Sequence, residues 1–491
     1  MDITQLSAFI ANKTVPPIPV RTEILEYELP VLKIEVPKKT AIVSSSSGKI
    51  QRRRIKTDGA PENVPMYPYE ISTRLSSLSL FDYSSQPVPD SKYEDLDAVE
   101  RERLRNIIRA YPNRGETALL ELDDEGLDKA LQLATIQDGV LVPTFCGLLL
   151  IGKREKLRQY MPTAESAIQI LSGTDVRVNE SFYLPILAAV EKITDYFNAC
   201  NREEEIEMGM FRMSVPDFDQ RAFREALVNA FSHRDYAALG RVRVEINDDG
   251  MTITNPGGFI EGIQADHLID AEPHGRNPVL ADALKRIGLA ERTGRGIDRI
   301  YEGSLLYGRL LPDYTESTSS RVKLFIPKGP TDKAFIRMVS EEHQRTGRSL
   351  PIYSLLVMNS LRRFHKASVQ DIAEDVHTDE TRVRVTLEKL TETGIVEAGG
   401  NGRGRYYMLS AGYYRNKDDM IAYTRQKGIP AIRHDELVMQ LAKEQGYVKR
   451  ADVVELLHIT PSQAYRVLAH LSEENKLELT GGGAGSKYVL K

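Results

Sequence analysis

Apolar side chains recur at strand or helix spacing along most of this chain, and the spacing changes several times. Residues 23–28 and 31–36 alternate between apolar and polar positions, which predicts a small β-rich module. Leucine and isoleucine interleaved with charges at residues 96–133 predict a helical stretch. Apolar runs at residues 139–153 and 167–171 predict segments that are buried in a core.

Between residues 216 and 327 the pattern alternates between helices and strands, which is typical of an α/β domain. Gly288 marks the end of one helix, and the glycines of Gly294-Arg295-Gly296 precede the next. The predicted helices are residues 184–197, 220–233, 278–287 and one that begins after Gly296, and the predicted strands are residues 242–246, 251–254 and 322–326.

Two segments near the start of the chain lack regular spacing. The four serines of residues 44–47 predict a loop, and the basic cluster that follows at residues 52–56 is more typical of a solvated face than of a nucleic-acid patch. Proline and acidic residues are frequent from residue 86 to residue 100. We therefore predict a linker there, with a domain boundary near residue 90.

An internal repeat dominates the C-terminal part of the chain. A shift of 81 places, without gaps, lays Asp371 on Asp452, and Tyr407 on Tyr488. Each copy is predicted to form helix, turn, helix and two short strands around a glycine-rich tip, which is the order of a winged helix-turn-helix. We assign residues 345–412 to the first module and residues 415–491 to the second.

The two modules offer basic side chains where such a fold contacts nucleic acid. In the first module Ser368 is predicted to cap the first helix of the motif, and Thr378 or Asp379 the second. These modules resemble the winged helices of bacterial transcription regulators, although winged helices also serve as protein-interaction domains. The candidate DNA-binding residues are Arg382, Arg384 and Lys389 on the second helix, Arg403 and Arg405 on the wing, and Arg466 and Lys487 in the second module.

Composition limits the remaining choices. A chain of 491 residues exceeds a single core, so several domains are expected. The net charge of −5 creates no overall basic field, so DNA contacts must come from local patches. Cys146 and Cys200 lack metal-ligand spacing, so no zinc site is read from them and a reducing cytoplasm is expected. No secretion signal is expected from the first residues, and the apolar run around residues 140–151 is too short to span a membrane.

A second set of residues carries candidate catalytic chemistry. The segment REALVNAFSHRDY places Glu225 and Asn229 on one helix face, and it resembles the N-box of the GHKL ATPases. The segments TNPGGF and TGRGI follow in the order of that family's adenine-pocket and phosphate-contacting boxes. The resemblance implies ATP and Mg²⁺ as cofactors, Glu225 as the base that activates water, Asn229 as the Mg²⁺ ligand, and Asn255, Gly257, Gly294 and Gly296 as further nucleotide-binding residues.

The chain departs from the family pattern at two positions. Asn255 stands where the family has the aspartate that reads adenine, and Phe259 replaces the second glycine of the same box. A domain that keeps this fold for dimerisation or for sensing another ligand is therefore the alternative to ATP binding.

Residues 91–330 as a whole resemble the ATP-binding domain of transcriptional regulators that are often labelled RecG-related. In that group the domain follows a Schlafen/AlbA-type DNA-binding domain. Residues 23–71 of this chain resemble the latter half of such a domain. We thus expect an α+β multidomain protein: a partial AlbA-like β-rich module at residues 1–90, a helical linker and GHKL-like α/β sandwich at residues 91–330, and two winged helix-turn-helix domains. Its expected role is a DNA-binding transcriptional regulator with duplex DNA, nucleotide and further copies of itself as partners, and no membrane.

Other functions stay open. An ATP-hydrolysing enzyme that acts on or docks to nucleic acid is the main alternative, and a Schlafen-like nuclease is another. A translocating helicase requires a G-x-x-x-x-G-K-[ST] loop. The pairs Gly48-Lys49 and Gly152-Lys153 are followed by Ile50 and Arg154, so the chain lacks that loop.

Overall fold

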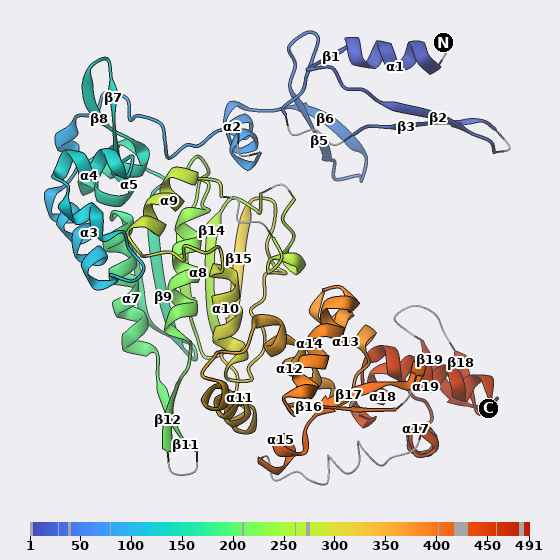
Figure 1. Cartoon of the computed structure of the whole chain (residues 1–491). Coiled ribbons are helices and arrows are strands. Elements are labelled where there is room, and N and C mark those ends of the chain that lie inside the picture. Colours follow the sequence, from blue (N-terminus) through green and yellow to red (C-terminus); the bar gives the residue numbers. More distant parts are fainter. Residues whose placement is uncertain are drawn as a thin grey trace. The chain divides into compact units, whose positions relative to one another are not determined.

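The structure, a computed structural model, describes residues 3–491 apart from 28, 38–40, 79, 209–210, 261, 272–274, 401, 417–430, 458 and 481–485. The chain, whose helices and strands are drawn in Figure 1, forms two units, each built from several segments. The first unit contains Met1–Cys200, Arg224–Ile297 and Asp313–Phe325, and the second contains Asn201–Phe223, Asp298–Pro312 and Ile326–Lys491. Helices and strands are mixed in both, as expected for an α+β multidomain protein.

A five-stranded mixed sheet forms the centre of the first unit, with the strand order β10-β9-β13-β14-β15. β9 pairs antiparallel with β10 and parallel with β13, and β13 pairs antiparallel with β14. Alternate residues of β13 are buried, as the sequence pattern predicts. The strands are β9 (Ser166–Ser172), β10 (Asp175–Phe182), β13 (Val242–Ile246), β14 (Gly250–Pro256) and β15 (Arg321–Pro327).

The predicted helices of this region are confirmed. Phe223, Leu227 and Phe231 lie one turn apart on α8 and are almost fully buried, which is the core-facing stripe of an amphipathic helix. Gly288 has a φ of +85° immediately after α9, a conformation that glycine adopts without strain. The helices are α7 (Ile186–Cys200), α8 (Gln220–Ser232), α9 (Pro278–Arg286) and α10 (Gly296–Leu305).

The helical stretch predicted at residues 96–133 contains two α-helices. Arg101 and Asp128 join them through a buried ion pair with 2.7 Å between Nη2 and Oδ2. The elements are α3 (Ala98–Ala110), a 3-10 helix at Thr117–Glu121, α4 (Asp124–Ala130), β7 (Ala134–Gln137), β8 (Val140–Pro143), α5 (Phe145–Ile151) and α6 (Arg154–Tyr160).

The prediction that residues 139–153 are buried throughout is wrong at its start. Six of the seven residues of α5 are buried, and Phe145 is the exception. Val140, however, is 62% exposed. Val140 belongs to the two-stranded β7–β8 sheet, in which successive side chains point to opposite faces, and its side chain points into solvent.

The N-terminal segment contains the two predicted short strands as β2 and β3, and two further strands, β5 and β6, that the sequence pattern did not predict. β2 pairs antiparallel with β3, and β5 with β6. The loop predicted at residues 44–47 is wrong at Ser44 and Ser45, because these two residues form β4 and pair with β1. The elements are α1 (Ile3–Asn12), β1 (Thr14–Val15), β2 (Arg21–Leu25), β3 (Val31–Glu35), β4 (Ser44–Ser45), β5 (Gln51–Ile55), β6 (Pro61–Pro65) and α2 (Pro68–Ser77).

The second unit carries the repeat. The two helices of each motif and the two wing strands begin and end at positions that differ by 81 residues, so the sequence repeat is also a structural repeat. The elements are β11 (Glu203–Met208), β12 (Phe211–Pro216), α11 (Lys333–Thr346), α12 (Ile352–Phe364), α13 (Val369–Val376), α14 (Glu380–Glu392), β16 (Val396–Gly399), β17 (Tyr406–Leu409), α15 (Ala411–Asn416), α17 (Ala431–Gln445), α18 (Arg450–Leu457), α19 (Pro461–Glu473), β18 (Leu477–Thr480) and β19 (Lys487–Leu490).

The wings confirm the winged form of both motifs. In the first copy Ala367, just before α13, pairs with Tyr407 in β17, and in the second copy Val448 pairs with Tyr488. These bridges add a third, one-residue strand to each two-stranded wing. Asp379 rather than Thr378 caps α14, since its side chain accepts a hydrogen bond from the N–H of Arg382.

Candidate nucleotide site and nucleic-acid interface

Three of the predicted nucleotide-site residues lie together. Glu225 and Asn229 are one turn apart on α8, and Gly296 begins α10 next to both of them. A Cβ atom on Gly296 would lie 3.4 Å from Oε2 of Glu225 and 3.6 Å from Nδ2 of Asn229. Because Gly296 has no side chain, nothing at this position separates Glu225 and Asn229 from the start of α10, where backbone N–H groups attract anions.

The carboxylate of Glu225 is in a poorly solvated environment. Its residue is 2% exposed, and Oε2 accepts a hydrogen bond from the N–H of Glu291 at 3.3 Å. Burial raises the pKa of the Glu225 carboxyl, and the neighbouring Arg224 and the Glu291 N–H offset part of that increase. A carboxylate with a raised pKa is a better proton acceptor, which is the property that a general base requires.

Asn255 and Gly257, at the end of β14, have different surroundings. The Asn255 amide is buried and donates to the carbonyl oxygen of Pro256 at 3.3 Å. Gly257 has a φ of +90°, and a Cβ there would lie 2.7 Å from Cβ of Asp235. Packing of the chain itself therefore requires a glycine at position 257, whether or not a ligand binds.

A buried network surrounds Gly257. Arg276 is 2% exposed, and its Nη2 donates to the carbonyl oxygen of Gly258 at 3.1 Å. Oδ2 of Asp235 accepts a hydrogen bond from the hydroxyl of Thr73 on α2 at 2.8 Å. Within the part of the chain that the structure describes, Nε of Arg276 is buried without a hydrogen-bond partner. Nη1 of Arg276 also donates to the carbonyl oxygen of Thr73 at 3.4 Å, so this side chain links the loop after β14 to α2.

The residues present fit a magnesium nucleotide in their chemistry. Asn229 supplies an amide oxygen, a hard donor of the type that Mg²⁺ accepts alongside phosphate oxygens and water. Gly294 has a φ of +76° in the loop before α10, so this turn depends on glycine. Asn229, Gly294 and Gly296 would hold the phosphate end of such a ligand, and Glu225 would act on the attacking water.

The first winged module exposes most of its predicted basic residues. Arg384 is 59% exposed and lies 3.9 Å from Glu380 on the same helix, and Lys389 is exposed. Arg382 is oriented differently, because its Nη1 donates to the hydroxyl of Tyr353 on α12 at 2.8 Å. The aromatic contact holds the Arg382 side chain against its own module, whereas Arg384 and Lys389 reach into solvent.

The wing of the first module is partly described. Arg405 is exposed, with its guanidinium 5.3 Å from the ring of Tyr407. The side chain of Arg403 lies outside the described residues, as does the second wing's tip at residues 481–485. Lys487, also exposed, stands 5.4 Å from the ring of Tyr447.

The start of α19 in the second module contacts the first module. Oδ1 of Asp371, on α13, accepts a hydrogen bond from the hydroxyl of Thr460 at 3.2 Å and lies 3.4 Å from Nη2 of Arg466. Ser462 donates to Glu374, also on α13, at 3.4 Å. Three residues of α19 and its cap, in the part of the helix that enters the major groove in such motifs, are therefore turned toward the first module.

Comparisons with known proteins agree with parts of this description. A family model described as "Putative ATP-dependent DNA helicase recG C-terminal" matches residues 240–326, and one described as a domain of unknown function, DUF8451, matches residues 75–167. The solved structure of the DIP2311 protein from Corynebacterium diphtheriae is similar, with 19% identity, a TM-score of 0.56 and coverage of 85% of this chain and 81% of that chain. The chain therefore shares its fold with DIP2311 over most of its length.

Two further comparisons add little. The mRNA-binding domain of elongation factor SelB from E. coli, solved with SECIS RNA, is 17% identical over 28% of this chain and 97% of that chain, but its TM-score of 0.13 supports no argument. No curated protein matches the chain. Among the described residues, no helix combines the length and the apolar composition that crossing a bilayer demands.

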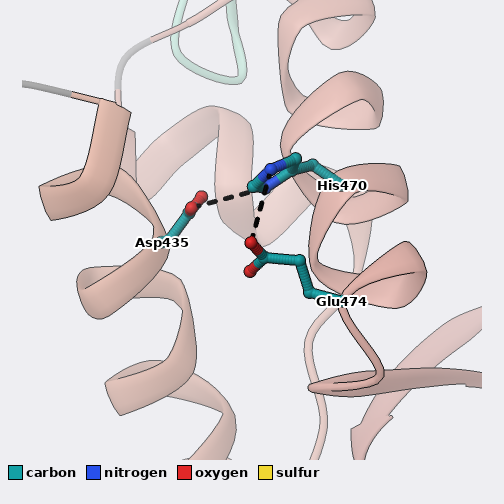
Figure 2. Close-up of side chains that lie close together, drawn as sticks. All are labelled: Asp435, His470 and Glu474. Atoms are coloured by element: carbon teal, nitrogen blue, oxygen red, sulfur yellow. Dashed lines mark ion pairs between the residues drawn. The ribbon is translucent and has the colours of Figure 1, made fainter.

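One group of side chains was missed from the sequence. Asp435, His470 and Glu474 lie together in the second module, with one potential metal-ligating atom of each within 4.8 Å of the others (Figure 2). The i, i+4 spacing of His470 and Glu474 was available as a signal, since it places both on one helix face. Asp435 belongs to a different helix, so only the folded structure adds it.

Proposed function

We propose that this protein binds duplex DNA through its first winged helix-turn-helix and acts as a transcriptional regulator. The observation that carries the proposal is the exposed basic surface of that module, formed by Arg384 and Lys389 on α14 and Arg405 on the wing. A recognition helix and a wing that present cations together fit a duplex, because the helix enters the major groove while the wing meets phosphates.

The asymmetry between the modules supports this choice. The start of α19 is occupied by contacts to α13, and Arg466 lies 3.4 Å from the buried carboxylate of Asp371. Arg384 of the first module lies instead beside the exposed Glu380 on its own helix. The second module then orients the first instead of reading DNA by itself.

The test is binding of the full chain to random duplex fragments, with sequencing of those retained. Replacing Arg384 and Lys389 together by alanine is expected to weaken binding by about 1–3 kcal/mol for each side chain that reads a base. The control variant Lys487→Ala, at an exposed lysine on the wing of the second module, should bind DNA as the unaltered chain does. Equal weakening in both variants, or no DNA affinity at low salt, would contradict the proposal.

A nucleotide site is the second proposal, supported by the convergence of Glu225, Asn229 and Gly296. Asn229→Ala is expected to abolish Mg²⁺-dependent nucleotide binding, whereas Glu225→Ala should retain binding and lose any hydrolysis, because a base acts only on the attacking water. Calorimetry with ATP, ADP and GTP tests this. A flat response to all three would remove the nucleotide site and leave DNA binding untouched.

The enzyme alternative makes a different demand on the same site. Steady ATP turnover in the absence of DNA would favour an ATP-hydrolysing enzyme docked to nucleic acid, and sequence-selective DNA binding without turnover would favour the regulator.

We also propose a homo-oligomer and the four-domain division at residues 90, 330 and 412. Sedimentation of the full chain and limited proteolysis test these two points.

A further inference from the structure

Three side chains from two helices meet at the surface of the second winged module (Figure 2). Asp435 projects from α17 toward the imidazole of His470 on α19. Glu474 follows His470 by four residues, at the C-terminal cap of α19. Oδ2 of Asp435 is 3.4 Å from Nδ1 of His470, and Oε1 of Glu474 is 3.6 Å from Nε2. The three residues thus form one cluster with an imidazole at its centre.

The helices that carry the cluster are fixed by a buried core. Val438 and Ala442 of α17 and Leu468 and Leu471 of α19 are all fully buried in that core. Asp435 precedes Val438 by three residues, and Glu474 follows Leu471 by three, so each carboxylate lies beside a core position of its own helix. The packing therefore holds the two carboxylates on either side of His470.

We propose that Asp435, His470 and Glu474 bind a divalent transition metal ion of the Zn²⁺ type. An imidazole nitrogen with two carboxylate oxygens is a donor set that such ions accept, with water in the remaining position. Ligand atoms around tetrahedral zinc lie about 3.3 Å apart for bonds of about 2.0 Å. Each carboxylate oxygen lies near that distance from one ring nitrogen, 3.4 Å from Nδ1 for Asp435 and 3.6 Å from Nε2 for Glu474, so the ring must turn before both oxygens face the same nitrogen. An ion bonds one ring nitrogen, and the His470 side chain is 55% exposed, so its ring has room to turn.

The ion pair between Lys476 and Glu474 leaves one carboxylate oxygen of Glu474 available to a metal ion. Nζ of Lys476 lies 2.6 Å from Oε2 of Glu474, and both side chains are partly exposed. The other oxygen, Oε1, is the one that faces His470. Without metal, the two carboxylates lie beside the imidazole of His470; with metal, the same three groups are ligands. The experiment must separate these two roles.

The internal repeat provides a natural comparison. At the positions equivalent to Asp435, His470 and Glu474, the first module has Ser354, Lys389 and Thr393. The first module packs α12 against α14 without any of the three ligands. The cluster is therefore not required by the winged fold itself, and it distinguishes the second module from the first.

The test is calorimetric titration of the metal-stripped full chain with ZnCl₂, and with MgCl₂ as a second probe. We expect one saturable Zn²⁺ site and no equivalent Mg²⁺ binding, because Mg²⁺ prefers oxygen ligands alone. His470→Ala and the near-isosteric Asp435→Asn should each weaken Zn²⁺ binding more than about tenfold. His343→Ala, which removes an exposed imidazole from α11, is the matched control and should bind Zn²⁺ unchanged.

A melting experiment distinguishes a metal ligand from an ion pair. Zn²⁺ is expected to raise the melting temperature of the unaltered chain and of His343→Ala, but not that of His470→Ala. Folded protein that fails to bind Zn²⁺, or a Zn²⁺ affinity that survives both His470→Ala and Asp435→Asn, would overturn the proposal. The result is independent of DNA and nucleotide binding, since neither ligand is in the assay.

Discussion

The hydroxyl of Thr460 donates a hydrogen bond to Oδ1 of Asp371 at 3.2 Å, although the two residues are 89 positions apart. The other oxygen of Asp371 accepts the N–H of Ser368 at 2.9 Å and so completes the capping box of α13. The Asp371 carboxylate thus takes part in the N-terminal cap of α13 in the first module, and it accepts a hydrogen bond from the N-cap residue of α19 in the second. Two modules with the same fold are joined by a contact that their common sequence pattern does not contain.

Asp371→Ala is expected to destabilise the winged modules more than Asp452→Ala, its counterpart in the repeat. Both changes remove an acceptor for a backbone N–H before a helix, worth about 1 kcal/mol. Only Asp371→Ala also leaves the buried O–H of Thr460 without its acceptor, which adds about 1–3 kcal/mol even though the same oxygen still accepts the N–H of Gln463. Scanning calorimetry of the full chain measures both, and equal destabilisation would show that the hydrogen bond between modules contributes nothing.

Arg405→Ala should weaken binding to duplex DNA by a similar factor for every sequence. A wing arginine meets phosphates, which carry no base information, so the slope of log affinity against log salt should fall by about 1. Titrations at several salt concentrations measure this slope. Lys487→Ala, at the wing of the second module, is the control and should leave the slope unchanged. A loss of affinity confined to one DNA sequence would instead assign Arg405 to base contacts.

Two glycines of α10 are expected to respond differently to alanine. At Gly296 the new methyl would meet Oε2 of Glu225 at 3.4 Å, an ordinary contact, so the fold should persist while nucleotide binding weakens. At Gly303 the new methyl would lie 2.5 Å from Cβ of Ala222. Either α10 or α8 must then shift, which should lower the free energy of unfolding by about 1–3 kcal/mol. Thermal melting and nucleotide calorimetry on both variants test this pair. Unchanged nucleotide binding in Gly296→Ala would argue against the site.

Glu225→Gln is expected to change the pH dependence of stability. Burial raises the pKa of the Glu225 carboxyl in the folded state, so ionisation is penalised there but not in the unfolded chain. That penalty is absent below the unfolded pKa and grows as the pH rises through the folded value. The variant should therefore be more stable than the unaltered chain near pH 8 and equal to it near about pH 4.

Melting temperatures across this pH range check the Glu225 prediction. Glu388→Gln, at an exposed position of α14, is the control because water solvates that side chain in both states. A constant difference between Glu225→Gln and the unaltered chain at all pH values would show that the effect comes from packing and not from ionisation.

Local pattern was sufficient to predict the helices and strands of residues 220–326 and those of the two helix-turn-helix motifs with their wings. The alternation of β13, the apolar stripe of α8 and the 81-residue repeat are periodic features, and each appears in the structure at nearly the predicted residues. Such features depend on neighbours a few positions away, so they can be read from the sequence directly. The prediction failed at Ser44 and Val140, where pairing of two short strands decided the outcome.

The sequence by itself therefore determined the periodic helices and strands of residues 220–326 and of the repeat, and that two helix-turn-helix modules follow one another. Tertiary structure alone decided which side chains meet: Asp82 accepts the N–H of Val279 at the start of α9, and Asp371 holds Thr460. It also brought Asp435 to His470 from a separate helix. The physical reason is that hydrogen bonds and ion pairs act over a few ångströms in space, and residues far apart in the chain reach that distance only after the cores have packed.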